Sequence, residues 1–183
     1  MNSLSKPIIV SGDDWLERIA RFRVSVWRAE GMLSDTCFTD GCCLELIDSK
    51  AIQVVVTDND RLVGAIRYYQ YEQLADCPNA SSFNLSCVSI PSPVATPERL
   101  VVDSDYKRRG IFKVLGLAVR ALCYRHGARC MISECAPPVA KALREMGRQS
   151  LGMAASDPRF PNTNYEWILS RVDLNERPPD LPF

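Results

Sequence analysis

The stretch from Glu98 to Leu117, ERLVVDSDYKRRGIFKVLGL, holds the residues of this chain whose types and spacing best suit chemistry. Within seven residues of a chain whose formal net charge is zero, four side chains are cationic: Lys107, Arg108, Arg109 and Lys113. Gly110 stands where a helix is expected to begin. A helix N-terminus offers free N–H groups and the positive end of its dipole, and glycine lets a ligand approach the backbone closely. The stretch therefore predicts a site for a phosphorylated ligand.

Two nucleotide-binding motifs are absent from the same stretch. It has neither the GxxxxGK[ST] of a P-loop nor the GxGxxG of a dinucleotide-binding fold. The alternative interpretation is a solvated basic turn at the start of a helix, where cations are slightly unfavourable because of the dipole.

The N-terminal half is predicted to supply a strand, a helix and a hairpin. Apolar residues at 15, 19, 22 and 26 lie on one face of a helix that runs to about Arg28, with Ser11 as its N-cap. A short strand at 7–10 precedes the helix. Strands at 51–57 and 61–69 flank the turn Asp58-Asn59-Asp60. Residues 32–50 are expected to be irregular, and residues 76–97 to form a long loop.

The C-terminal half is predicted to alternate strands and helices. The expected elements are a strand at 98–102, a helix from Gly110 to Gly127, a strand at 128–133, a helix from Pro137 to about Met146, and a strand at 165–169. This order indicates an α/β or α+β fold with a central mixed sheet. We expect a single domain over residues 1–183, with its core at about 7–172 and a loose tail at 173–183.

Composition excludes several classes of function. The balance of 22 basic and 22 acidic residues argues against a nucleic-acid-binding protein. Eight cysteines without a CxxC pair, beside a single histidine, predict no metal site and reduced thiols. No apolar run is long enough to span a membrane, and the N-terminus has no signal-peptide pattern, so we expect a cytoplasmic protein.

The basic stretch resembles motif A of the GCN5-related N-acetyltransferases, the GNAT superfamily. That motif reads Arg or Gln, two residues, Gly, one residue, then Gly or Ala, after a strand like ERLVV. Lys107 stands at the first position and Phe112 at the last, and both are departures. The run VAKALREMG at 139–147 is similar to the next helix of the family, with Arg148 in place of a common Phe. The resemblance covers residues 98–147, and the order of elements fits a complete domain of this family. It implies a mostly antiparallel twisted sheet with helices on both faces.

The resemblance also implies acetyl-CoA or a longer acyl-CoA as acyl donor. The residues expected to bind the pyrophosphate are Lys107, Arg108, Arg109, Gly110, Ile111, Phe112 and Lys113. The pantetheine arm would pair with the backbone of Leu100, Val101 and Val102. The thioester would lie where that strand diverges from the strand at 128–134.

Forming an amide from a thioester requires a group that takes a proton from the amine, a donor for the oxyanion, and a proton for the leaving thiolate. Glu98 is the first candidate for the base, and period-2 alternation places it on one face with Leu100 and Val102. Glu134 is the second. A backbone N–H near Leu100 or Val101 would stabilise the oxyanion. Many family members use a tyrosine as general acid where this chain has Leu143, so the alternatives are Cys135, Tyr124 or a thiolate that leaves unprotonated.

The N-terminal half is similar to the autoinducer-synthase-like and N-acyl-amino-acid-synthase-like members of the superfamily. This likeness rests on the segments FRVSVW at 22–27, the acidic loop at 35–40, and LVGAIR at 62–67. It implies Arg23, Trp27, Asp40 and Arg67 as residues of the acceptor site. It also implies a medium or long acyl donor, on CoA or on an acyl carrier protein.

The function expected from the sequence is acyl transfer to a primary amine of a small molecule, an amino acid or a peptide. The alternative from another class is a module of this fold that binds acyl-CoA without catalysis. A homodimer is possible in either case.

Overall fold

The computed structural model describes residues 4–34, 36–86, 88–161 and 163–175. These residues form a seven-stranded sheet in the order β1-β2-β3-β4-β5-β7-β6. The β4–β5 pair is parallel, and the other neighbouring pairs are antiparallel. The elements are β1 (Ile8–Val10), α1 (Asp13–Ala29), β2 (Ile52–Asp58), β3 (Arg61–Tyr71), β4 (Val94–Val102), α2 (Ile111–His126), β5 (Cys130–Cys135), α3 (Pro137–Glu145), β6 (Gln149–Met153) and β7 (Glu166–Arg171).

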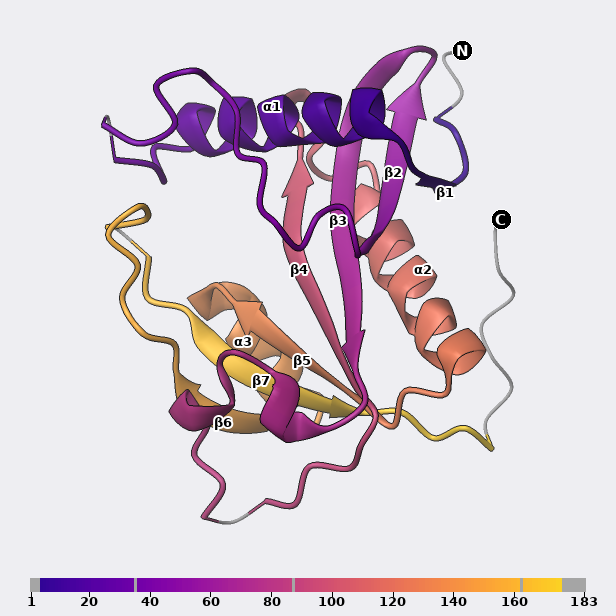
Figure 1. Cartoon of the computed structure of the whole chain (residues 1–183), viewed down its shortest axis with the longest axis vertical. Helices are drawn as coiled ribbons and strands as arrows, with labels where there is room; N and C mark the ends of the chain where they lie inside the picture. The colour runs from indigo at the N-terminus through magenta and orange to yellow at the C-terminus, as the bar shows by residue number, and fades with distance from the viewer. Residues whose placement is uncertain (1–3, 35, 87, 162, 176–183) are drawn as a thin grey trace.

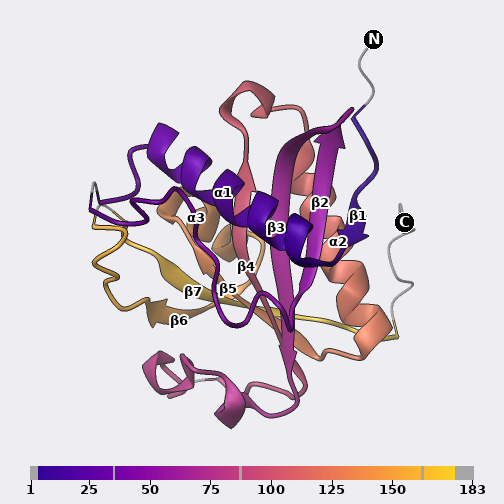
Figure 2. The same ribbon diagram turned by 45° about the horizontal axis from the view of Figure 1, so that its top comes forward.

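Helices cover both faces of the sheet. Helix α1 crosses the front of β2, β3 and β4, and α2 lies behind them (Figures 1 and 2). Ile19, Val24 and Trp27 of α1 pack on one face, while Leu115, Ala118 and Leu122 of α2 pack on the other. Helix α3 packs on β5 and β7 through Ala140. The predicted mixed, mostly antiparallel sheet with helices on both faces is confirmed. In the described part of the chain, no helix is both long and apolar enough to cross a membrane.

Strands β4 and β5 diverge soon after they meet. They pair only at Val94 with Cys130 and at Ala95 with Met131. Beyond these residues β4 continues beside β3 while β5 continues beside β7, and the two strands separate in a V (Figure 1). We call residues 96–102 of β4 and 132–135 of β5 the β4–β5 fork. Its β4 arm has a backbone edge that no β5 residue pairs with.

A bulge interrupts β4 within the fork. Ala65 pairs with Val101 but Arg67 pairs with Glu98, so the single residue between the two on β3 lies opposite Arg99 and Leu100. Arg99 adopts a positive φ of 55°, which is uncommon for a residue with a side chain.

Because of the bulge, the side chain of Glu98 lies on the opposite face of the sheet from those of Leu100 and Val102. Glu98 points to the α1 side of the sheet, where it meets Arg67. Leu100 and Val102 pack instead against the core beneath α2. The prediction that all three residues share a face is wrong, because the extra residue reverses the alternation.

Several boundaries also differ from those expected. Strand β4 begins at Val94, inside the predicted loop, and β6 was not expected. The N-cap of α1 is Gly12 rather than Ser11. The two ends of α2 are as predicted, with Gly110 and Gly127 both in the left-handed conformation. Of the predicted tail, residues 176–183 lie outside the described residues.

Close packing of α2 on β3 depends on Gly64. A Cβ at this position would lie 2.5 Å from Ile111 Cγ2 and 3.3 Å from Leu115 Cδ1. Ile111 is the first residue of α2, so a side chain at position 64 would push on the start of that helix. The small residue on β3 therefore fixes where the basic loop before α2 is held.

Candidate active site at the β4–β5 fork

A cluster of paired charges lies between α1 and the sheet. Arg23 of α1 is 1% exposed and Arg67 of β3 is 2% exposed. Arg23 donates from Nη1 to both oxygens of Asp48, at 2.9 and 3.0 Å, and from Nη2 to Gln53 at 3.1 Å. The backbone N–H of Glu45 also donates to Asp48, at 2.8 Å. Buried charges need such partners, and these contacts join α1, β2 and the loop before β2.

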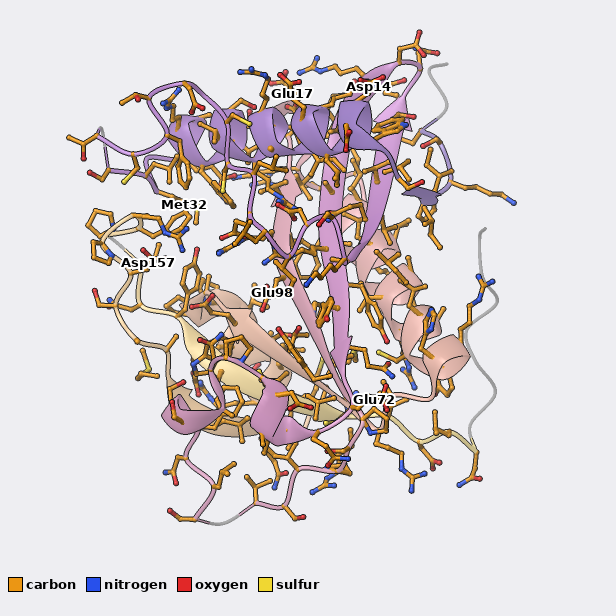
Figure 3. The ribbon with its side chains drawn as sticks, in the orientation of Figure 1. Asp14, Glu17, Met32, Glu72, Glu98 and Asp157 are labelled. Carbon is orange, nitrogen blue, oxygen red and sulfur yellow. The ribbon has the colours of Figure 1, made fainter. Side chains whose placement is uncertain are left out.

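Arg67 is the centre of the cluster. Its Nη1 donates to Glu45 at 2.7 Å and to Asp48 at 3.0 Å, and its Nη2 donates to Glu98 at 2.5 Å. One guanidinium therefore holds three carboxylates. Glu98 lies near the middle of the molecule, between α1 and β5 (Figure 3).

Arg99, at the bulge, binds Glu45 with two parallel hydrogen bonds. Nε donates at 2.9 Å and Nη2 at 2.7 Å, which is the bidentate geometry of a strong arginine–carboxylate pair. Burial alone would raise the pKa of Glu45, but the hydrogen bonds and charges of Arg99 and Arg67 outweigh burial and lower this pKa to about 2. Glu45 is therefore ionised at neutral pH.

A second pair approaches from the segment before β7. Arg159 donates from Nη2 to Asp157 at 2.7 Å, and its Nη1 lies 3.4 Å from Glu45. The pKa of Asp157 is lowered, chiefly by its hydrogen bonds from Arg159. We call these eight residues the charge cluster: Arg23, Glu45, Asp48, Arg67, Glu98, Arg99, Asp157 and Arg159.

The structure brings together most of the predicted acceptor-site residues. Arg23 and Arg67 lie in the charge cluster, together with Glu98, the first candidate for the base. Trp27 lies beside it, with the Arg99 guanidinium 6.0 Å from its ring and Phe160 packed edge-on at 5.0 Å. Asp40 lies elsewhere, in an exposed turn where its carboxylate accepts from the N–H of Cys42.

Five members of the charge cluster were not predicted from the sequence. Glu45 and Asp48 come from the loop taken as irregular, and Arg99 was hidden within the expected strand. Asp157 and Arg159 precede the last strand. The sequence does contain one signal of this cluster. Arg67 lies on an apolar strand and Arg23 on the apolar side of a helix, and two buried cations require carboxylates from an adjoining segment.

Glu134 faces the charge cluster from the β5 arm of the fork. It pairs in register with Trp167, so its side chain points to the α1 side of the sheet. Within the described residues, the side chain of Glu134 forms no hydrogen bond or ion pair. Although its side chain has exposed surface, partial burial raises the pKa of Glu134; Glu98 and Asp157 add to this rise, while Arg99 and Arg159 oppose it.

Tyr165, which precedes β7, lies near Glu134 and Arg99. Burial raises the pKa of Tyr165 to about 12, and the charge of Glu134 adds to the rise. The hydroxyl is therefore protonated at neutral pH and is a possible hydrogen-bond donor beside Glu134.

The basic loop leads into α2 at the other end of β4. Gly110 has φ 80°, with no atom within 4 Å of the place where a Cβ would stand. The Arg109 guanidinium lies 4.6 Å from the ring centre of Tyr106, whose hydroxyl donates to Asp58 at 2.7 Å. Lys107 forms an ion pair of 2.7 Å with Glu30, at the end of α1. Arg108 and Lys113 are exposed, and the first turn of α2 has no acidic residue, so its N-terminus suits an anionic ligand.

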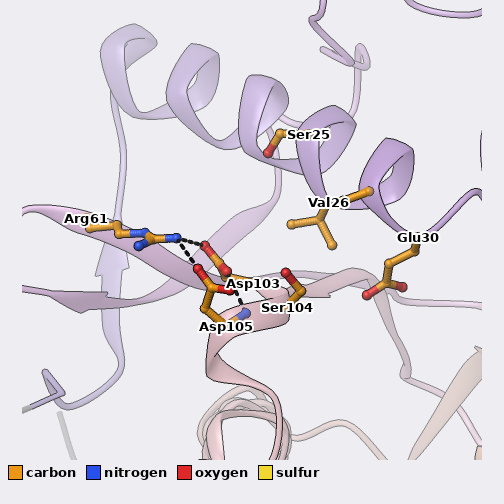
Figure 4. A pocket seen from close by; sticks show the side chains of 8 residues that line it. Ser25, Val26, Glu30, Arg61, Asp103, Ser104 and Asp105 are labelled. Atoms are coloured by element: carbon orange, nitrogen blue, oxygen red, sulfur yellow. Dashed lines mark hydrogen bonds and ion pairs between the residues drawn. The ribbon is translucent and has the colours of Figure 1, made fainter.

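A pocket of about 180 Å³ lies between α1 and the segment Asp103–Asp105. Figure 4 shows its single arginine, Arg61, held by Asp103 and Asp105, at 2.7 and 3.2 Å. Glu30 adds a third carboxylate to the lining. Because acidic groups outnumber the cation, this pocket suits phosphates less well than the exposed start of α2 does.

Three buried thiols are poorly suited to act as nucleophiles. Burial raises the pKa of Cys135, Cys123 and Cys130 to about 12. The described cysteines are free, and the described residues contain no group of side chains that could hold a metal ion. Leu143, at the position of the family's tyrosine, packs against the small core beneath α3.

Comparison with known proteins identifies the family and the fold. The model of the acetyltransferase (GNAT) family matches residues 14–153. No curated protein matches the chain.

Solved structures share the fold at low sequence identity. BjaI, a CoA-dependent acyl-homoserine lactone synthase with SAM and isopentyl-CoA, is 18% identical with a TM-score of 0.70, over 91% of this chain and 84% of its own. FeeM, an N-acyl amino acid synthase from uncultured soil microbes, is 12% identical with a TM-score of 0.68, over 94% and 92%. YncA from Salmonella typhimurium, with acetyl-CoA, is 10% identical with a TM-score of 0.53, over 96% and 99%.

Proposed function

The chain belongs to the acetyltransferase (GNAT) family, and on that premise we propose that it transfers an acyl group from acyl-CoA to a primary amine. The observation that carries the proposal is the β4–β5 fork, which has an unpaired strand edge, a phosphate-suited loop at its end, and carboxylates on both arms. The acceptor class comprises amines of small molecules, amino acids and peptides.

The donor is proposed to bind along β4 and at the start of α2. Arg108, Arg109 and Lys113 would contact its phosphates together with the N–H groups that follow Gly110. The open space at Gly110 supports this fit. The pantetheine arm would form main-chain hydrogen bonds with Leu100, Val101 and Val102, because β5 leaves this edge of β4 unpaired. The solved structures of BjaI with isopentyl-CoA and YncA with acetyl-CoA support a CoA donor.

The chemistry needs no covalent enzyme intermediate. The amine attacks the thioester carbon, the C–S bond breaks and an amide forms. Backbone N–H groups at the Arg99–Leu100 bulge are proposed to stabilise the oxyanion, because a bulge releases backbone groups from the ladder. Glu98 and Glu134 are the two candidates for the base. Arg67 holds the carboxylate of Glu98, whereas that of Glu134 has no partner among the described residues, and this difference favours Glu134 as the group that takes the proton.

A donor with a longer acyl chain, on CoA or on an acyl carrier protein, is the second candidate. It is supported by the resemblance in fold to BjaI and FeeM. Glu98, Trp27 and Arg99 would lie near the acceptor in either case.

Thermal unfolding tests the donor first. CoA, acetyl-CoA, octanoyl-CoA and palmitoyl-CoA at equal concentration should each raise the Tm, because a ligand that binds only the native state stabilises it. A larger rise with longer chains would favour a fatty-acyl donor. Thiol release with a panel of amines then tests turnover. If no donor raises the Tm and no amine is acylated, acyl transfer from CoA is excluded.

A further inference from the structure

We infer that the acceptor is a primary amine that carries no carboxylate, and that Glu134 binds its ammonium group and takes its proton. The inference rests on the proposed acyl transfer and narrows its acceptor class. It follows from which charges in the site already have partners.

Every arginine of the charge cluster is bonded to a carboxylate. Arg23 binds Asp48 at 2.9 Å and Arg67 binds Glu98 at 2.5 Å. Arg99 binds Glu45 at 2.7 Å, and Arg159 binds Asp157 at 2.7 Å. Four arginines and four carboxylates thus balance within the cluster, and no cation there is left for a substrate carboxylate.

A substrate carboxylate would have to displace one of these partners. Arg23 and Arg67 are too deeply buried to be reached. Displacing Glu45 from Arg99 would leave a half-buried carboxylate without two of its charge-assisted hydrogen bonds, which is costly. Arg159 is the most exposed of the four, at 38%, but Asp157 holds it through both Nε and Nη2. The cluster thus opposes a substrate that brings another negative charge.

Glu134 is the fifth carboxylate, and within the described residues it has no partner. It faces Glu98, Asp157, Arg99 and Arg159 across the fork, with Tyr165 beside it. An ammonium ion bound there would supply the missing positive charge. A substrate amine is the group in this reaction that carries such a charge at neutral pH.

The proton transfers balance with Glu134 as the base. The ammonium gives one proton to Glu134, and the nitrogen lone pair attacks the thioester carbon. The C–N bond forms and the C–S bond breaks. The second nitrogen proton neutralises the departing thiolate, and Glu134 returns its proton to water. The products are a neutral amide and free thiol, so the positive charge that Glu134 attracted is gone when the product leaves.

This acceptor class differs from those of the similar structures. BjaI was solved with SAM, and FeeM is an N-acyl amino acid synthase. Both SAM and amino acids carry a carboxylate. The fold is shared, but the charges of this site favour a monoamine or a diamine.

Matched pairs of acceptors test the inference directly. Tyramine with tyrosine, phenethylamine with phenylalanine, and putrescine with ornithine each differ by one carboxylate. With acetyl-CoA and octanoyl-CoA as donors, thiol release and product mass give kcat/KM for each member. We expect the amine to exceed its amino acid by tenfold or more. Amino acids that equal or exceed their amines would overturn the inference while confirming acyl transfer.

Variants separate the role of Glu134 from general damage. Glu134→Gln should lower kcat/KM for amines by about 10²-fold or more, the usual contribution of a general base, and leave the Tm rise caused by acyl-CoA unchanged. Glu134→Asp should recover part of the loss. Glu72→Gln, at the far end of β3 (Figure 3), is the matched control and should behave as wild type. Unchanged turnover in Glu134→Gln would exclude Glu134 as the base.

If neither series is acylated, the proposed acyl transfer fails, and binding still tests the acceptor class. In the presence of CoA, amines should then raise the Tm of the wild type more than amino acids do, and this difference should vanish in Glu134→Gln. Equal shifts for the two series would overturn the inference.

Discussion

Arg67 on β3 donates a 2.5 Å hydrogen bond to Glu98, its register partner on β4, at the start of the bulge. The same guanidinium holds Glu45 and Asp48 from the loop before β2. One buried arginine thus connects the β4 arm of the fork to the segment that closes it from the α1 side. The geometry of the proposed site depends on this residue, although substrate does not reach it.

Replacing Arg67 should therefore destabilise the protein strongly. Arg67→Met removes the cation and leaves Glu98, Glu45 and Asp48 partly unpaired. Loss of one partner from a buried ion pair costs about 3–5 kcal/mol. Urea denaturation measures the change. Arg21→Met, which breaks an exposed pair with Glu17, should cost far less, because solvent screens an exposed ion pair. Equal losses in the two variants would show that the cluster contributes no more than a surface pair.

Acid should weaken the fold through Glu45. Its pKa is about 2 in the folded protein, against 4.5 for an ordinary glutamate. A carboxyl whose pKa is depressed on folding contributes stability above its unfolded pKa, and loses that contribution as pH falls toward the folded value. We expect Glu45 to contribute roughly 3 kcal/mol at neutral pH, and this contribution to be lost between pH 4.5 and about 2. The free energy of unfolding should fall less steeply over this range in Glu45→Gln, and the same slope in both proteins would contradict the assignment.

The sequence predicted the parts of this protein that depend on local pattern. Apolar residues at helical spacing located α1, and the glycines at 110 and 127 located both ends of α2. The cations of the basic loop were visible because they are neighbours in the chain. Glu45, 54 residues from Arg99, was not, because a buried ion pair across the fold leaves no periodic trace. The bulge was also not predictable, since one extra residue reverses the alternation of side chains between the two faces without changing the composition. For this reason the prediction that Glu98 shares a face with Leu100 and Val102 was wrong.

Gly64 should tolerate no side chain. Gly64→Ala places a Cβ 2.5 Å from Ile111, and overpacking of this kind typically costs about 1–3 kcal/mol. Because Ile111 begins α2, the variant should also weaken the Tm rise caused by CoA. Gly116→Ala is the matched control, since nothing lies within 4 Å of a Cβ there. In the middle of α2 it should instead stabilise by about 0.5–1 kcal/mol. Destabilisation by both variants would argue against the contact at Gly64.

The basic loop should bind the phosphates of the donor. Arg108→Ala with Arg109→Ala should weaken CoA binding about tenfold or more, since hydrogen bonds to charged groups contribute about 1.5–3 kcal/mol each. The loss should shrink in high salt, because exposed charges are screened. Arg125→Ala, at the opposite end of α2, should bind CoA normally. An S-acyl-pantetheine donor, which lacks the pyrophosphate, should be used equally by wild type and variant. Unchanged affinity in the double variant would exclude the loop from donor binding.

The pH dependence of turnover should report Glu134. A general base acts when it is deprotonated, so activity should fall as pH drops through its pKa, which burial raises above the ordinary 4.5. This acidic limb lies above the range in which Glu45 protonates, so it should appear while the protein is still folded.

The raised pKa of Glu134 also predicts an effect on stability that does not depend on activity. A carboxyl that holds its proton more tightly when folded is destabilising once it ionises, and its cost grows as pH rises from 4.5 through the folded pKa. Glu134→Gln should therefore be more stable than wild type at neutral pH, with an advantage that disappears below pH 4.5. An acidic limb that persists in Glu134→Gln would return the role of base to Glu98, and no gain in its Tm at neutral pH would contradict the raised pKa of Glu134.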